Sequence, residues 1–272
     1  MKETRRVAVR LAYDGSRFFG FQRQPGRYTV EGSVINALES IGAVKSVREC
    51  GFRSSSRTDR GVSALGNVVS FKTDFSLGSL CSALNSGLDD VWAYSAVTVE
   101  DDFNPRWARQ RWYRYFLPVA SQDATVLREV AQSFVGTHNF SRFARVDGRD
   151  PVRTIDSIAI AESGTFFTMD FKAESFLWNM VRRMVWYIDA AASGAIEGDS
   201  SPLDPGYSLR RTGLAPAKHL LLMDVDCGID FPRNPKAGRA VRHELQRRVV
   251  SLSLMGEFAR MLLETLGPDD SQ

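Results

Sequence analysis

Hydrophobic residues in the first hundred positions alternate between two periods. Residues 7–13 are apolar at every second position, and Asp14-Gly15 ends the run, which is typical of a strand followed by a turn. Apolar residues in 30–41 fall at helical spacing, with Thr29 as N-cap and Gly42 as the stop. The same criteria predict a strand at 67–71, a helix at 76–88 and a strand at 91–99. The first half therefore has the order strand, helix, strand, helix, strand.

The second half of the chain repeats this order and adds a hairpin. The pattern predicts strands at 112–117, 152–161, 165–173 and 219–226, and helices at 123–135 and 176–192. Glu162-Ser163-Gly164 joins the two middle strands and is a hairpin signal. Gly136 ends the first of these helices, and we expect residues 138–143 to form a loop.

A long amphipathic helix is predicted at 239–266, with its basic residues early and its apolar residues late. Such a face is more typical of packing onto the protein or of a dimer contact than of a membrane anchor. We therefore divide the chain into a first half at 1–102, a second half at 103–230 and a helical tail at 231–272. We expect the tail to pack on the second half or to lie at a dimer contact.

Composition sets broad limits on function. The chain has 272 residues, of which 43% are hydrophobic and 25% charged, as in a folded globular protein with one large or two ordinary domains. A net charge of +3 is too mild to indicate nucleic acid, so the local distribution of charge has to decide. The early charges exclude a signal core, and no apolar run approaches a membrane span. We expect a soluble, intracellular protein.

The cysteines and histidines give no metal signal. The three cysteines are far apart in the sequence, which favours reduced thiols in a cytoplasm. The three histidines are equally scattered, and no His/Cys cluster has the spacing of metal ligands. The sequence therefore predicts no structural metal site.

The strongest local candidate for chemistry is the segment 54–64, Ser-Ser-Ser-Arg-Thr-Asp-Arg-Gly-Val-Ser-Ala. It places one carboxylate, Asp59, between Arg57 and Arg60, with Gly61 following. Small residues and a glycine let the backbone turn sharply beside a ligand, and flanking guanidinium groups keep a carboxylate ionised and attract phosphate. The alternative is a surface turn in which the aspartate binds its own backbone amides.

Arginines alternate with aromatic residues in two further segments. Residues 17–24, which include Arg23, form a loop that could stack on bases, although half-buried packing is the commoner role of such a loop. Residues 103–117 are rich in arginine, tryptophan and tyrosine and contain no acid, as on a nucleic-acid surface. The strand at 112–117 puts Tyr113 and Tyr115 on one face and Arg114 on the other.

Arg182 interrupts the apolar stripe of the helix at 176–192. An arginine in this position usually extends along the surface to reach water. The alternative is a partly buried side chain that pairs with a carboxylate elsewhere in the core. The residues alone leave both open.

Read together, these segments resemble the tRNA pseudouridine synthase A family, and they occur in the family's order. The matching segments are Tyr13-Asp14-Gly15 with Gly20-Phe21-Gln22 and Gln24, Arg57-Thr58-Asp59-Arg60-Gly61-Val62, Tyr113-Arg114-Tyr115, Gly136-Thr137-His138-Asn139-Phe140, Phe176-Leu177 through Met180-Val181-Arg182, and Gly213-Leu214-Ala215-Pro216. Each is weak alone, but six in order are highly specific.

The resemblance implies an α+β fold of two ferredoxin-like halves, whose antiparallel sheets form a continuous sheet around a basic cleft. It also implies conversion of uridine to pseudouridine in the anticodon stem-loop of tRNA (tRNA positions 38–40), without a cofactor and usually as a homodimer. The expected partners are thus tRNA and a second copy of the chain, with no other protein.

The resemblance also implies roles for individual residues. Asp59 is the expected nucleophile or base, Arg182 the ion-pair partner that keeps it ionised, and Tyr113 the ring that stacks on uracil and a candidate base for its C5 proton. The expected substrate-binding residues are Arg57, Arg60, Tyr113, Arg23 and Arg114.

Three residues depart from the family's usual pattern. Ser63 stands where histidine is common, Phe21 where tryptophan is common, and Arg60 where alanine is frequent. These departures leave Asp59 in place and bear on the RNA contacts. Two alternatives stay open: a pseudouridine synthase that acts on another RNA, and a non-catalytic tRNA-binding protein.

Overall fold

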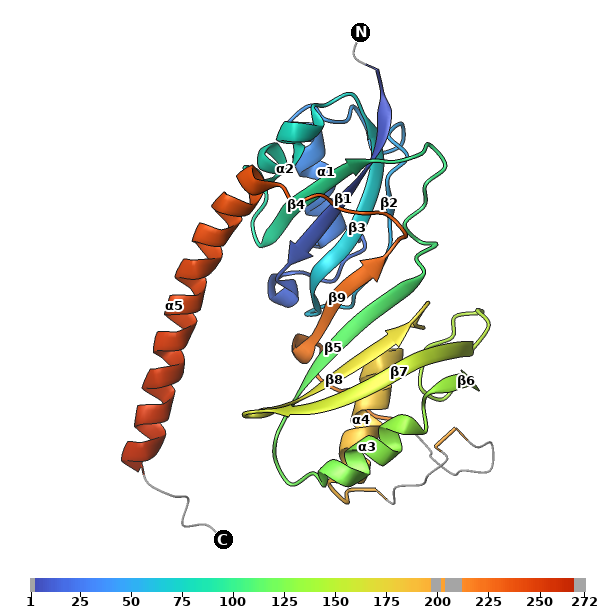
Figure 1. Ribbon diagram of the computed structural model, residues 1–272, viewed down its shortest axis with the longest axis vertical. Coiled ribbons are helices and arrows are strands. Elements are labelled where there is room, and N and C mark those ends of the chain that lie inside the picture. Colours follow the sequence, from blue (N-terminus) through green and yellow to red (C-terminus); the bar gives the residue numbers. More distant parts are fainter. Residues whose placement is uncertain (1–2, 197–201, 204–211, 267–272) are drawn as a thin grey trace.

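Nine strands form one continuous sheet through both halves of the chain in the computed structural model, which describes residues 3–196, 202–203 and 212–266 (Figure 1). The strands are β1 (Arg5–Tyr13), β2 (Arg53–Ser54), β3 (Ser63–Thr73), β4 (Val91–Thr98), β5 (Gln110–Pro118), β6 (Gly136–Asn139), β7 (Val152–Ser163), β8 (Phe166–Ala173) and β9 (Leu220–Asp226). The helices are α1 (Val30–Ser40), α2 (Leu77–Asn85), α3 (Ala124–Gln132), α4 (Met180–Ala192) and α5 (Pro235–Leu266), with short 3₁₀ turns η1 (Gly15–Arg17) and η2 (Ala217–His219). The protein is therefore a mixed α+β fold.

One order of strands runs across the sheet from the first half into the second. It is β4-β1-β3 in the first half, with β2 paired to β3, and β9-β5-β8-β7-β6 in the second. Pairs within each half are antiparallel. The halves join where β3 and β9 run parallel, with Ser63 opposite Leu221 and Ala64 opposite Leu222. The segment that precedes β3 thus ends at the junction between the halves.

Strand β5 lies beside this junction and shows which face of the sheet is buried. Arg111, Tyr113 and Tyr115 are buried, whereas Trp112 and Arg114 between them are only partly covered. This alternation follows from the period of two in a β-strand. The prediction that Tyr113 and Tyr115 share a face, opposite Arg114, is confirmed.

Most predicted elements are present, and the differences have local causes. Residues 136–139 were expected to lie in or next to a loop, but they pair with β7 and form β6. Helix α4 begins at Met180 rather than at Phe176, because Asn179 has a left-handed backbone with φ of 64° that interrupts a right-handed helix. Helix α5 begins at Pro235, earlier than predicted, since proline suits the first helical position.

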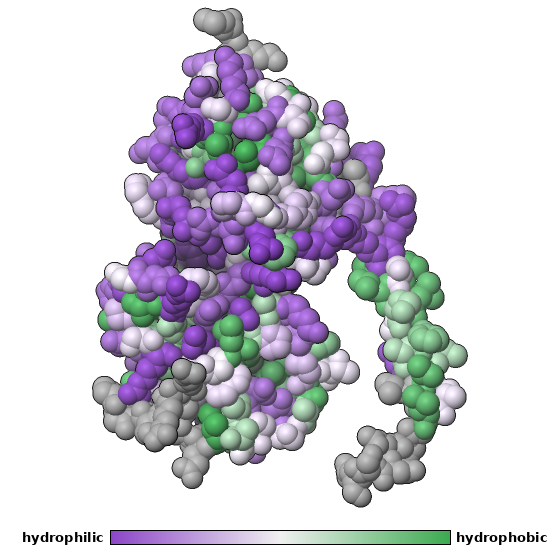
Figure 2. Space-filling model, turned by 180° about the vertical axis from the view of Figure 1, so that it is seen from behind, coloured by the Kyte–Doolittle hydropathy of each residue, from purple (hydrophilic) through white to green (hydrophobic). Residues whose placement is uncertain are grey.

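Helix α5 contacts the first half of the chain. The sequence pattern placed it on the second half or at a dimer contact, but Trp92 of β4 donates to Glu244 Oε2 at 3.0 Å and the Arg248 guanidinium lies 5.2 Å from the centre of the Trp92 ring. Beyond Arg248 the helix projects away from the sheet (Figure 1). Large hydrophobic side chains there are exposed, from 44% for Leu262 to 72% for Leu252, and they give the helix its hydrophobic surface in Figure 2.

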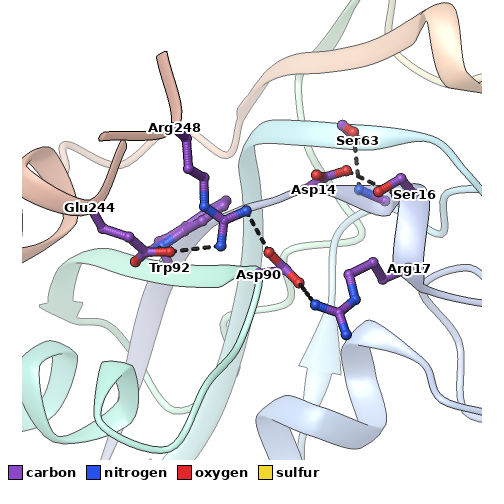
Figure 3. A network of polar contacts seen from close by, with 9 residues as sticks. Asp14, Ser16, Arg17, Ser63, Asp90, Trp92, Glu244 and Arg248 are labelled. Atoms are coloured by element: carbon purple, nitrogen blue, oxygen red, sulfur yellow. Dashed lines mark hydrogen bonds and ion pairs between the residues drawn. The ribbon is translucent and has the colours of Figure 1, made fainter. Parts of the chain in front are cut away.

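Asp90 joins α5 to the turn after β1 (Figure 3). Its side chain is only 5% exposed and accepts from Arg248 Nη1 at 2.6 Å and from Arg17 Nη1 at 3.2 Å. Its backbone oxygen accepts from the Asp14 amide at 3.0 Å. Because a buried carboxylate is costly without partners, the helix and the turn are held by the same anion.

Among the described residues, no helix combines the length and apolar character that crossing a membrane requires.

We expect the substitution Asp90→Asn to lower the free energy of unfolding by about 1 to 2 kcal/mol, because two charge-assisted hydrogen bonds are weakened. Asparagine tolerates the positive φ of 59° at this position, so the change tests the charge rather than the backbone. Denaturant unfolding measures the effect. Asp89→Asn, at the exposed neighbouring position, is the matched control, and equal effects of the two changes would contradict the assignment.

Candidate active site

An open cavity of about 1040 Å³ brings together segments from both halves of the chain. Its walls come from the loop at 54–62, from residues 19–24, from β5, from residues 145–149 and from the start of α4. Seven arginines and two aspartates are among the lining residues, all of which lie in the described ranges: Arg57, Arg60, Arg106, Arg111, Arg145, Arg149, Arg182, Asp59 and Asp147. A cavity of this size and charge suits part of a larger anionic molecule.

Asp59 and Arg182 meet in this cavity. Arg182 Nη1 donates to Asp59 Oδ2 at 3.0 Å, and the two side chains are 13% and 23% exposed respectively. Arg182 Nε donates to the Ala215 carbonyl at 2.8 Å, and the Ala215 amide donates back to the Arg182 carbonyl at 3.2 Å. Of the two placements considered for Arg182, the structure has the partly buried, paired one. The guanidinium is thus aimed at the carboxylate by the segment that leads into β9.

Buried hydrogen bonds hold the loop that carries Asp59. The hydroxyls of Thr58 and Tyr13 are 2.8 Å apart, and Asn67 Nδ2 donates to Tyr13 Oη at 3.1 Å and to the Ser56 carbonyl at 3.0 Å. Ser55 Oγ donates to Asn67 Oδ1 at 2.7 Å. Burial raises the pKa of Tyr13 far above its usual range, so its hydroxyl stays protonated. The loop is therefore pre-organised by polar residues beneath it.

Gly20 lets the first wall of the cavity pass close to the loop. A Cβ at this position would lie 3.1 Å from the Thr58 carbonyl oxygen, and its φ of 98° disfavours other residues. The neighbouring Phe21 amide donates to the same carbonyl at 3.0 Å. The Gly-Phe-Gln motif thus supports the backbone on the N-terminal side of Asp59.

Tyr113 lines the cavity and is 9% exposed. Its ring meets Phe176 edge to face, with centroids 5.3 Å apart. The pKa of Tyr113 is raised to about 12. Burial is the largest cause of this rise, the positive charge of Arg111 opposes it, and the negative charge of Asp59 adds to it. A phenol with this pKa is protonated at neutral pH, so it can donate a hydrogen bond but is a weak base.

Arg57, Arg106 and Arg149 form one cluster of cations in the lining. Burial, followed by the charges of Arg106 and Arg149, lowers the pKa of Arg57, which places the three guanidinium groups near one another. None of the three has an ion pair with a carboxylate in the described part of the chain. Such a group is suited to phosphate.

Arg60 also lines the cavity, where its guanidinium lies 4.3 Å from the centre of the Phe19 ring. Two other arginines expected to bind substrate lie outside the cavity lining. Arg114 pairs with Asp170 at 2.7 Å, on the face of β5 opposite Tyr113, and Arg23 lies 3.9 Å from Glu31. Strand alternation turns Arg114 away from Asp59, and each of these two arginines lies near a carboxylate of its own, so their role in substrate binding stays a prediction for RNA outside the cavity.

Two of the departures from the family pattern have structural roles. Ser63 Oγ accepts from the Gly15 amide at 3.0 Å, beside the junction of β3 and β9. Phe21 is 1% exposed and packs near Tyr13, with ring centroids 6.1 Å apart. Both positions support the loop, and Phe21 lines the cavity together with Arg60.

Sequence reasoning missed several lining residues. Arg106 and Arg111 lie in the arginine-rich segment already noted, and Arg111 shares the buried alternation of Tyr113. Arg145, Arg149 and Trp178 come from connections between elements, where no periodic pattern shows which way a side chain points. The described residues contain no group of three or more His, Cys, Asp or Glu side chains that could hold a metal ion.

Comparison with known proteins gives a consistent result. A family model described as tRNA pseudouridine synthase matches residues 130–226. The tRNA pseudouridine synthase A of Pyrococcus abyssi is 44% identical over 248 residues, which cover 89% of this chain and 93% of that protein. The chain belongs to the tRNA pseudouridine synthase A family. This is a family of isomerases.

Other relatives in this family are similar over most of their length. The synthase A of Thermococcus kodakarensis is 38% identical over 265 residues, covering 93% of this chain and 98% of that protein. That of Methanoculleus marisnigri is 40% identical over 240 residues, covering 87% and 88%. Among solved structures, a chain of a Cbf5-Nop10-Gar1 complex aligns with a TM-score of 0.35 and 12% identity over 67% of this chain and 44% of that chain, which supports no inference.

We expect the buried phenol of Tyr113 to make stability depend on pH above 10. In the unfolded chain a tyrosine ionises near pH 10, but here its pKa is about 12, so its contribution is complete below pH 10 and is lost as pH rises to 12. The difference in unfolding free energy between wild type and Tyr113→Phe should change by up to about 2 kcal/mol over this interval.

Denaturant unfolding at fixed pH values checks this expectation. Leu117→Ala, on the same buried face of β5, is the control, because it should lower stability by a similar amount at every pH. Parallel pH curves for wild type and Tyr113→Phe would show that the phenol does not ionise differently in the folded protein.

Proposed function

We propose that this protein converts uridine to pseudouridine in the anticodon stem-loop of tRNA, on the 3′ side of the anticodon, with Asp59 as the essential carboxylate. The observation that carries the proposal is the pair of Asp59 and Arg182 at 3.0 Å inside a cavity lined by arginines. The printed names of its relatives, which specify tRNA and pseudouridine, support the substrate and the product.

The reaction breaks the bond between ribose C1′ and uracil N1, turns the base, joins C1′ to C5 and removes the C5 proton. A stacked base cannot turn, so the uridine must leave the helix and enter a pocket. Asp59 either attacks the nucleotide covalently or removes the 2′ proton to give a glycal, and both routes need an ionised carboxylate. Arg182, fixed by Ala215, places a positive charge beside this carboxylate, with Nη1 3.0 Å from Asp59 Oδ2.

Tyr113 limits the movement of the detached uracil in this proposal. Its ring lines the cavity beside Asp59, and its phenol is protonated at neutral pH. We therefore assign it stacking and hydrogen bonding, and its phenol is also the candidate base for the C5 proton. Arg57, Arg106 and Arg149 would hold phosphates near the target, and Arg60, from the same loop as Arg57, would also contact the RNA. Arg23 and Arg114, which lie outside the cavity lining, would contact parts of the tRNA farther from the target.

We also propose that each half is a ferredoxin-like unit and that the cavity is the basic cleft between them. The repeated strand order, with β9 and β4 at matching places, supports this. The proposed units are residues 1–102 and 103–230, followed by the tail at 231–272. A cytoplasmic location is proposed as well, and the three free thiols are consistent with a reducing compartment.

We expect Asp59→Asn to reduce turnover by roughly a thousandfold or more while leaving tRNA affinity within a few fold, because the carboxylate acts in the chemical step. Arg182→Ala should also abolish turnover, and Arg182→Lys should retain only part of it, since lysine keeps the charge but loses the planar fork. Tritium release from tRNA labelled at uridine C5 measures turnover, and mapping of the product identifies the modified position.

Arg183→Ala is the matched control for this experiment. Arg183 is next to Arg182 on α4, but its Nη1 donates to Thr212 Oγ1 at 2.7 Å and it does not line the cavity. Its loss should leave turnover near that of wild type. Full activity of Asp59→Asn would place the chemistry elsewhere, and modification only of another RNA or another stem would overturn the proposed substrate.

We further propose a homodimer in which α5 contacts the same helix of a second copy. Beyond Arg248 the described helix has almost no contact with its own chain. Its apolar side chains are therefore exposed, and Leu252, Met255 and Phe258 are each more than 60% exposed. An apolar helix face of this length is normally covered. Since every copy carries the same helix, pairing about a two-fold axis covers both faces at once.

We expect the double substitution Leu252→Asp and Met255→Asp to convert a dimer to a monomer, because it would bury charges in the helix pair. Light scattering coupled to size-exclusion chromatography measures the mass. Ser253→Asp is the control, since Ser253 shares the polar stripe of Glu257 and Arg260. A wild-type chain that is monomeric at micromolar concentration, or a dimer unaffected by the double change, would contradict this arrangement.

A further inference from the structure

Trp178 is an exposed aromatic residue at the edge of the cavity. It lies in the connection between β8 and α4, lines the same cavity as Asp59 and is 46% exposed. Tryptophan is usually well covered in folded proteins, because its ring buries a large apolar area. Nothing in the proposed chemistry at Asp59 uses this ring, so its exposure needs another explanation.

The Trp178 ring is backed by an arginine from the facing loop. The Arg145 guanidinium lies 4.3 Å from the centre of the indole, and the Arg145 amide donates to the Trp178 carbonyl at 2.9 Å, within an isolated β-bridge. Arg145 Nε also donates to Asp147 Oδ1 at 2.8 Å. Two independent contacts therefore hold the arginine against one side of the ring, and the cavity lies beside it.

Phe19 is another aromatic residue that lines the cavity, but its ring already has two cations over it. The guanidinium groups of Arg27 and Arg60 lie 4.6 Å and 4.3 Å from the centre of the Phe19 ring, so two arginines already stack on it. Trp112 also has two cations over its ring, Arg114 and Lys172, and lies outside the cavity lining. Among these three rings, Trp178 combines a position in the cavity with a single stacked cation.

We propose that Trp178, backed by Arg145, stacks on a nucleobase next to the uridine that enters the pocket. This proposal rests on the proposed function, because a base that leaves its stack deprives its neighbours of a stacking partner. An indole can replace that partner for any base, and the guanidinium behind it strengthens the contact. The ligand of this subsite is thus an unpaired or partly unstacked RNA base, bound without selection of its identity.

The position of the subsite fits the nearby cations. Arg149 lies in the same loop as Arg145 and belongs to the group with Arg57 and Arg106. These arginines would hold the phosphates of the nucleotide whose base rests on Trp178. Stacking and phosphate binding then fix the strand on one side of the target, while Asp59 and Tyr113 act on the target itself.

The test measures binding of an anticodon stem-loop RNA by full-length protein, with fluorescence anisotropy as the readout. Base stacking on an aromatic ring implies that Trp178→Ala weakens binding by roughly 5- to 100-fold, whereas Trp178→Phe stays within a few fold of wild type. Phe166→Ala is the matched control, because Phe166 is an exposed aromatic residue on the β7–β8 hairpin that does not line the cavity, and it should bind like wild type.

A scan of abasic nucleotides on either side of the target identifies the stacked base. For wild type, one abasic position should weaken binding by about the same factor as Trp178→Ala. With Trp178→Ala that position should have no further effect, since the partner ring is already gone. Unchanged binding by Trp178→Ala, or equal losses for both proteins at every abasic position, would overturn the proposal.

If Trp178→Ala folds poorly, two measurements still test the proposal. One is the abasic scan with wild-type protein, and the other is a comparison of Trp178→Phe with wild type by tryptophan fluorescence. Quenching on RNA binding should be larger for wild type than for Trp178→Phe, and equal quenching would count against stacking. Conversion of the same RNA is measured in parallel. A wild-type protein that binds but does not convert it would overturn the proposed function, while the binding comparison would still decide the role of Trp178.

Discussion

The site depends on one ion pair that joins the two halves of the molecule. Asp59 belongs to the loop before β3, and Arg182 belongs to α4, 123 residues later in the chain. A largely covered carboxylate is costly unless a cation with good geometry neutralises it. The 3.0 Å contact between them therefore requires that the two halves keep a fixed relative position, and much of the surrounding structure serves this requirement.

The junction of β3 and β9 provides that fixed position. β3 begins directly after the loop that carries Asp59, and its first two residues pair with β9. The segment leading into β9 contains Ala215, whose backbone binds Arg182 at both its carbonyl and its amide. One short parallel pairing thus sets the register of the loop against the residue that orients Arg182. A slip of one residue would turn the side chains at the junction to the other face of the sheet.

Local patterns in the sequence predicted the elements well but could not predict most contacts of the site. Alternation alone gave the opposite faces of Tyr113 and Arg114, because a strand has a fixed period. It could not show that Arg114 has Asp170 as a partner on the next strand, or whether Arg182 is paired, since these contacts depend on tertiary structure. The contact of α5 with the first half could not be predicted for the same reason, because its anchors, Glu244 and Arg248, meet residues that are distant in the sequence.

The anchor of α5 and the support of the loop that carries Asp59 share one turn. Asp90 binds Arg248 and also accepts the Asp14 amide, and the next residue, Gly15, donates to Ser63 at the start of β3. A Cβ at Gly15 would lie 2.1 Å from the Val62 carbonyl oxygen, so only glycine fits there. Val62 in turn donates to the Asp59 carbonyl at 3.1 Å. The base of α5 is thus linked to the loop through the turn after β1, and this makes the tail part of the support of the site rather than a separate appendage.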